Sequence, residues 1–100
     1  MSDRECLELM DEAAWCLLEV ALADPFTTPP QMRTECLWAV EMLATLGADP
    51  LRHPPRPRAD PYARLREALA LLAALPPSMF AEAAVLDAAE AAQAALAAFV

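Results

Sequence analysis

Residues 3–23, DRECLELMDEAAWCLLEVALA, form the stretch that decides the fold. At 100° per residue, this segment is apolar around more than half of a helical wheel. Four of its acidic residues gather in a narrow stripe, and Asp11 lies apart from them; the stripe consists of Glu5, Glu8, Glu12 and Glu19. A surface helix usually has an apolar face a little over about 100° wide, whereas a wider one is buried by several neighbours. We therefore expect a helix that is covered on three sides, by this chain or by a second copy.

Capping residues and prolines set the expected ends of the helices. Residues 2–5 (SDRE) and 28–31 (TPPQ) both match the capping box, in which Ser2 or Thr28 would accept a hydrogen bond from a free backbone N–H. Gly47 is the residue type favoured just past the end of a helix. Together with the proline pairs along the chain, these signals predict helices near 3–23, 29–46, 61–75 and 78–98, a loop at 47–60, and no strand.

The composition supports an all-α fold. Ala, Leu and Glu are abundant, whereas Ile is absent and Tyr occurs once. Short breaks between successive helices force antiparallel neighbours. We predict that residues 1–100 form a single domain, an antiparallel four-helix bundle of two helical hairpins. The Pro- and Arg-rich segment 47–60, hereafter the arm, joins the hairpins, and polyproline II is its expected conformation.

The distribution of charge excludes several classes of partner. The chain carries a net charge of −8, with a local excess of +4 confined to residues 51–66. Nucleic acid is not expected, because an acidic body cannot neutralise phosphates. A membrane span is not expected either, because no apolar run reaches about 18 residues. The charged N-terminus does not resemble a signal peptide, so we expect a cytoplasmic protein with three reduced cysteines.

No group of residues predicts catalysis or a metal site. The glutamates of 3–23 point away from the apolar arc, and the only histidine, His53, lies in the arm. Cys16, Cys36 and Met32 could approach one another in a hairpin and hold a soft metal such as Cu(I). Buried cysteine more often serves as a small apolar residue, and this is the interpretation we favour. We expect no cofactor, no metal ligand and no enzyme.

The arm allows two interpretations. Its arginines Arg52, Arg56 and Arg58 could lie across the acidic stripe of the same chain, or they could dock onto a partner. In the first case we expect exposed ion pairs, which contribute only about 0–1 kcal/mol each. Charge reversal at Arg56 and Arg58 would then change the melting temperature little.

Apolar residues away from the expected core predict an interface. Trp38 and Met42 lie opposite the core face of the helix at 29–46, and Trp15 and Leu22 flank the acidic stripe of 3–23. Trp and Met are enriched at interfaces, so we predict a two-fold homodimer through these two helices. In the alternative interpretation, both tryptophans lie under Phe26 and the arm.

The sequence thus predicts a non-catalytic protein–protein interaction module, such as an accessory, adaptor or regulatory subunit. It would bind another protein, one with a basic surface in particular, through the first two helices and through the arm as a second contact. One alternative is a small acidic inhibitor or immunity-type protein, and another is a small-molecule or soft-metal bundle using Cys16 and Cys36. The expected interaction residues are Trp15, Leu22, Trp38, Met42, Arg52, Arg56 and Arg58.

Overall fold

The computed structural model describes residues 1–98, and these form four α-helices with no strand among them. The helices are α1 (Asp3–Ala21), α2 (Pro30–Ala44), α3 (Pro61–Ala73) and α4 (Ala83–Ala97), with short 3₁₀ turns η1 (Pro50–Arg52) and η2 (Pro77–Ala81). The predicted all-α fold is confirmed. Within 1–98, no helix has both the length and the apolar character needed to cross a membrane.

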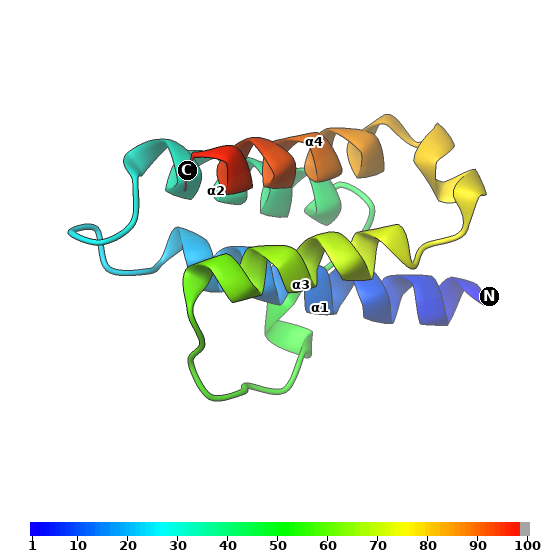
Figure 1. Cartoon of the computed structure of the whole chain (residues 1–100). Helices are drawn as coiled ribbons and strands as arrows, with labels where there is room; N and C mark the ends of the chain where they lie inside the picture. Colours follow the sequence, from blue (N-terminus) through cyan, green and yellow to red (C-terminus); the bar gives the residue numbers. More distant parts are fainter. Residues whose placement is uncertain (99–100) are drawn as a thin grey trace.

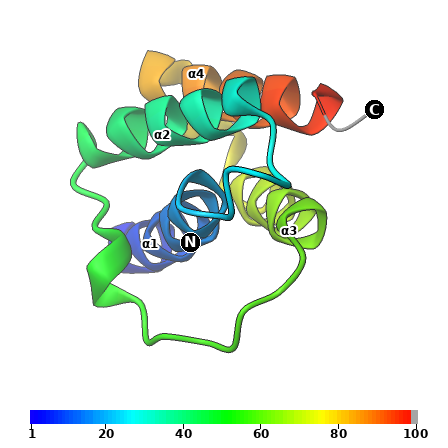
Figure 2. The same cartoon turned by 90° about the vertical axis from the view of Figure 1, so that its left-hand side faces the viewer.

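The helices lie in two layers. α1 and α3 are side by side in one layer, and α2 and α4 form the other (Figure 1). Each hairpin contributes one helix to each layer, and the layers cross obliquely (Figure 2). All neighbouring pairs are antiparallel, as predicted for two hairpins. The arm passes along the face of the α1–α3 layer that is turned away from α2 and α4 (Figures 1 and 2).

The core lies between the two layers and draws on every helix. Its largest fully buried side chains include Leu17, Met32, Leu43, Leu65, Leu72 and Val85. α4 packs chiefly on α2 and contributes mainly alanines to the core, among them Ala88, Ala92 and Ala95. Small side chains let the two helix axes approach closely, which explains why an alanine-rich segment can form half of a layer.

α1 is the central helix, and it is covered on three sides by α2, α3 and η1. This confirms the burial predicted from its wide apolar arc. All of the cover comes from the same chain, so the width of the arc alone does not require a second copy.

Two helix ends differ from the sequence prediction. Ser2 and Glu5 form the expected capping box of α1. The second box is wrong: Pro29 is the cap residue of α2 and makes no side-chain bond, while the buried Thr28 hydroxyl has no partner among residues 1–98. Proline at consecutive positions holds the chain extended before Pro30, so Thr28 is too early in the chain to cap the helix.

The fourth helix begins later than the predicted residue 78. Residues 77–81 form η2, whose i→i+3 hydrogen bonds bring Met79 and Phe80 against the core before α4 begins at Ala83. The C-terminal end of α2 forms as expected. Gly47 has a φ of 93°, and the N–H of Ala48 donates to the carbonyl of Leu43 at 3.2 Å. The arm also contains η1, where polyproline II was expected.

Cys36 provides a test of the core. Its thiol is fully buried, and burial raises its pKa to about 12. We expect Cys36→Ala to reduce the free energy of unfolding by about 1–2 kcal/mol in urea denaturation, because the side chain is lost without a replacement. The exposed Leu51→Ala is the control and should change it little. A thiol reagent at pH 8 should label Cys36 only after unfolding; rapid labelling of the native protein would contradict the burial.

Candidate functional site

A buried carboxylate on α1 fixes the start of the arm. Asp11 is 6% exposed. Its Oδ1 accepts a hydrogen bond from the backbone N–H of Asp49 at 2.7 Å, and its Oδ2 accepts one from Arg52 Nε at 3.0 Å. Arg52 also donates to the carbonyl of Gly47. A buried carboxylate is tolerated only when it is paired and hydrogen-bonded, and the arm supplies both requirements here.

Beyond this anchor, cationic side chains cover Trp15. The guanidinium carbons of Arg56 and Arg64 each lie 4.8 Å from the centre of the Trp15 ring. The ring of His53 lies 5.3 Å from the same ring at an interplanar angle of 35°. Guanidinium groups are attracted to the face of an indole ring, so Trp15 joins the arm, α1 and α3.

Three glutamates neutralise the two arginines. Glu67 accepts a hydrogen bond from Arg56 at 2.7 Å and from Arg64 at 2.8 Å. Arg64 also pairs with Glu19 at 2.5 Å, and Arg56 approaches Glu12 at 3.6 Å. The hydrogen bond from Arg56 is the main reason that the pKa of Glu67 is lowered. The network thus closes on itself within one chain.

These contacts support the first interpretation of the arm, in which it lies across its own acidic helix. Arg52 and Arg56 are engaged with α1 and α3. Arg58 is exposed and has no ion pair with any other residue of 1–98. The sequence analysis assumed exposed ion pairs, but the side chain of Arg56 is only 31% exposed. Charge reversal at Arg56 should therefore lower the melting temperature more than the sequence suggested.

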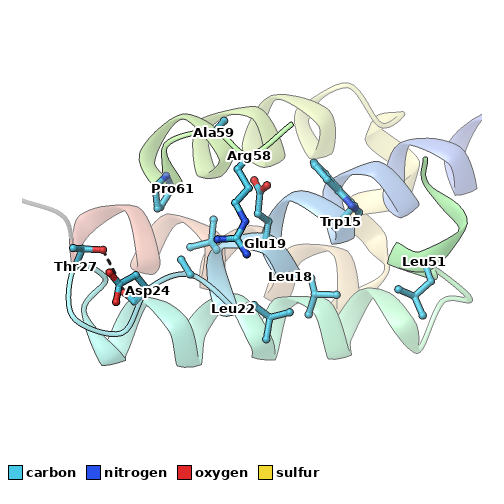
Figure 3. A pocket seen from close by; sticks show the side chains of 12 residues that line it. Trp15, Leu18, Glu19, Leu22, Asp24, Thr27, Leu51, Arg58, Ala59 and Pro61 are labelled. Atoms are coloured by element: carbon cyan, nitrogen blue, oxygen red, sulfur yellow. Dashed lines mark hydrogen bonds between the residues drawn. The ribbon is translucent and has the colours of Figure 1, made fainter. Parts of the chain in front are cut away.

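A pocket of about 370 Å³ lies between the end of α1 and the last part of the arm. We call it the α1 pocket (Figure 3). Its apolar wall includes Trp15, Leu18, Leu22, Leu51 and Pro61, and its polar lining consists of Glu19, Asp24, Thr27 and Arg58. The side chains of Leu22 and Leu51 are 70% and 83% exposed, so the apolar surface continues from the pocket onto its rim.

A second hollow of about 400 Å³ lies between α2 and α4. We call it the Trp38 hollow; its lining consists of Glu35, Trp38, Asp87, Glu90, Ala91 and Ala94. Trp38 is 49% exposed, as the helical wheel predicts. Met42, which was expected beside it on the surface, instead packs against the core and is partly buried. Trp38 and Met42, which lie one turn apart on α2, thus differ in their exposure to solvent.

The described residues form no cluster of three or more typical metal ligands. Within residues 1–98, no group of three His, Cys, Asp or Glu side chains could hold a metal ion. Cys16 Sγ accepts a hydrogen bond from Arg56 at 3.4 Å, and burial raises its pKa to about 12. A protonated thiol beside a guanidinium is a poor ligand for a cation. The hypothesis of a soft-metal site at Cys16 and Cys36 therefore gains no support from this geometry.

Sequence reasoning missed Asp11 and Glu67 as members of this site, whereas Arg64 belongs to the basic segment 51–66 that the charge distribution indicates. Asp11 carried a signal, because a single acid inside an apolar arc must find a partner. The helical pattern of residues 61–75 places Glu67 on the outer face of that helix. Nothing in the local sequence indicates that the arm folds over this face. Comparisons with protein-family models, with curated proteins and with solved structures give no match.

Glu67 makes stability depend on pH. Its pKa is lower in the folded than in the unfolded chain, so its contribution is complete above the unfolded value of about 4.3 and is lost as the pH falls through the folded value. We expect Glu67→Gln to be less stable than the wild type at pH 7, and the difference to shrink below about pH 4. Glu41→Gln, an exposed change on α2, should show no such convergence in thermal melts at several pH values.

Arg56 and Arg58 form a matched pair of positions in the arm. Arg56→Gln removes the hydrogen bond to Glu67 and the stack on Trp15, so we expect a loss of about 1–3 kcal/mol in the free energy of unfolding. Arg58→Gln removes the same charge without breaking an intramolecular contact and should leave stability unchanged. Equal melting curves for the two variants would show that the contacts of Arg56 with Glu67 and Trp15 contribute nothing to folding.

Proposed function

We propose that this protein is a non-catalytic interaction module, an accessory or regulatory subunit, which binds an arginine-bearing segment of another protein in the Trp38 hollow. The observation that carries this proposal is a half-exposed tryptophan surrounded by three carboxylates, those of Glu35, Asp87 and Glu90. None of the three forms an ion pair with another residue of 1–98.

The site at Trp15 indicates which side chain would suit the hollow. At Trp15, an indole ring and neighbouring glutamates hold two arginines through stacking and charge-assisted hydrogen bonds. Trp38 has the same kinds of group around it, but no cation of the described chain reaches them. A guanidinium from outside could stack on the indole and pair with a carboxylate at once, which a lysine ammonium does less well.

The charge of the whole chain favours the same partner. With a net charge of −8, the surface attracts basic proteins and accelerates their association. Tryptophan is also among the residues that most often dominate the energy of an interface. A small acidic inhibitor of a basic enzyme would use the same chemistry and differs only in the identity of its partner.

Catalysis is not part of the proposal, because the side chain of His53, the only histidine in the sequence, is 16% exposed and its Nδ1 is buried without a hydrogen-bond partner among residues 1–98. His53 stacks on Trp15, and its Nε2 lies 3.7 Å from Glu12. A general base needs a substrate proton within reach, whereas Nδ1 of His53 is buried and its Nε2 faces Glu12.

A capped peptide with alternating arginine and alanine is a suitable probe, compared with the same peptide carrying neutral citrulline. In a Trp15→Phe background, fluorescence reports on Trp38 alone. We expect saturable quenching by the arginine peptide, weakened about threefold or more by Glu90→Gln, since one charged contact is lost.

Glu8→Gln is the matched control, because it removes the same charge from an exposed position of α1. If both variants weaken binding equally, the peptide responds only to net charge and the proposed site is wrong. Quenching by the citrulline peptide with similar affinity would also contradict it.

A further inference from the structure

We propose that the α1 pocket receives Phe26 from a second copy of the chain, so that the protein forms a two-fold dimer with two reciprocal insertions. This goes beyond the proposed function, because the α1 pocket lies on the α1 and arm side of the molecule and the Trp38 hollow lies between α2 and α4.

Phe26 is presented to solvent by an ordered turn. Phe26 is 96% exposed, the largest value among the exposed large apolar residues of 1–98. Asp24 holds the turn, since its Oδ1 accepts from the N–H of Phe26 at 2.9 Å and its carbonyl accepts from the N–H of Thr28 at 3.0 Å. Phe26 therefore covers neither tryptophan, so this part of the alternative interpretation is wrong, although the arm does cover Trp15. A phenylalanine fixed in this position is typical of a contact that a partner completes.

The pocket lies next to this side chain. Asp24 and Thr27, which belong to the same turn as Phe26, line the α1 pocket (Figure 3). Phe26 itself is not part of that lining. Exposed Leu22 and Leu51 belong to the same lining, so the apolar surface continues from the pocket onto its rim. In a two-fold interface the same patch occurs on both subunits. A two-fold rotation axis beside this rim would place Phe26 of each copy over the pocket of the other copy.

Electrostatics favour a second copy at this face over the rest of the surface. Most of the chain is acidic, so two copies repel each other at the Trp38 hollow with its three carboxylates. At the α1 pocket, Glu19 is already neutralised by Arg64. Arg58 lines the pocket without an ion pair in residues 1–98, and across a two-fold axis it could pair with Asp24 of the other copy. The proposed dimer interface therefore lies at the α1 pocket, and not at Trp38 and Met42 as the sequence suggested.

Light scattering and sedimentation measure the association directly. From about 1 to about 200 μM, we expect the wild type to pass from one to two copies of 10.8 kDa. Phe26→Ser should weaken dimerisation about tenfold or more. At a concentration where both proteins are monomeric, its melting curve should match that of the wild type, because the residue is exposed. Leu86→Ser on α4, also exposed, is the control and should dimerise normally.

A pocket-filling variant separates insertion of Phe26 from general stickiness. Ala59 is exposed and lines the pocket, so Ala59→Phe should occupy it from within the chain and weaken dimerisation as Phe26→Ser does. Mixing the two variants restores one intact pocket facing one intact Phe26, and the mixture should contain more dimer than either variant alone. No increase on mixing, unchanged dimerisation of Phe26→Ser, or a wild type that stays monomeric would each overturn the proposal. The last result would leave the pocket to a small apolar ligand or to a different protein.

Discussion

The burial of Asp11 is the constraint on which the site depends. A carboxylate within the apolar arc of α1 cannot remain unpaired, and only the arm brings donors to it. Once Arg52 and the Asp49 backbone are fixed there, the next residues must run along α1. His53 and Arg56 then lie over Trp15, and Leu51 and Arg58 come to the α1 pocket. One buried charge therefore determines which side of α1 is closed and which groups remain available to a partner.

The two tryptophans differ in whether arginine side chains of the same chain cover them. Arg56 and Arg64 pair with carboxylates of α1 and α3 and lie over Trp15. Within residues 1–98, no arginine pairs with the acidic residues around Trp38. The same kind of ring, with the same kind of acidic neighbours, is thus saturated at one site and open at the other. The consequence is a molecule with one acidic face and one face of mixed charge. The acidic face suits a basic partner, whereas the mixed face suits a surface like itself.

The sequence predicted what local signals determine. The ends of α1 and α2 follow from Ser2 and Gly47, whose effects act within a few residues. The site depends instead on contacts between residues that are far apart in the chain, such as Asp11 with Arg52 and Glu19 with Arg64. A helical wheel gives the direction of each side chain but not the segment that will cover it. For this reason Trp15 and Trp38 looked equivalent in the sequence and differ in the structure.

The positions of the two proposed contacts have a consequence for affinity. The α1 pocket uses the arm side of α1, and the Trp38 hollow uses the contact between α2 and α4 in the other layer. Occupation of one does not cover the lining of the other, because the two linings share no residue. A dimer joined at its α1 pockets would therefore keep both hollows open. Such a dimer is bivalent, and a partner with two basic segments would bind the second hollow at a high effective concentration once the first is filled. Self-association would then raise affinity for such a partner without adding any contact to the hollow itself.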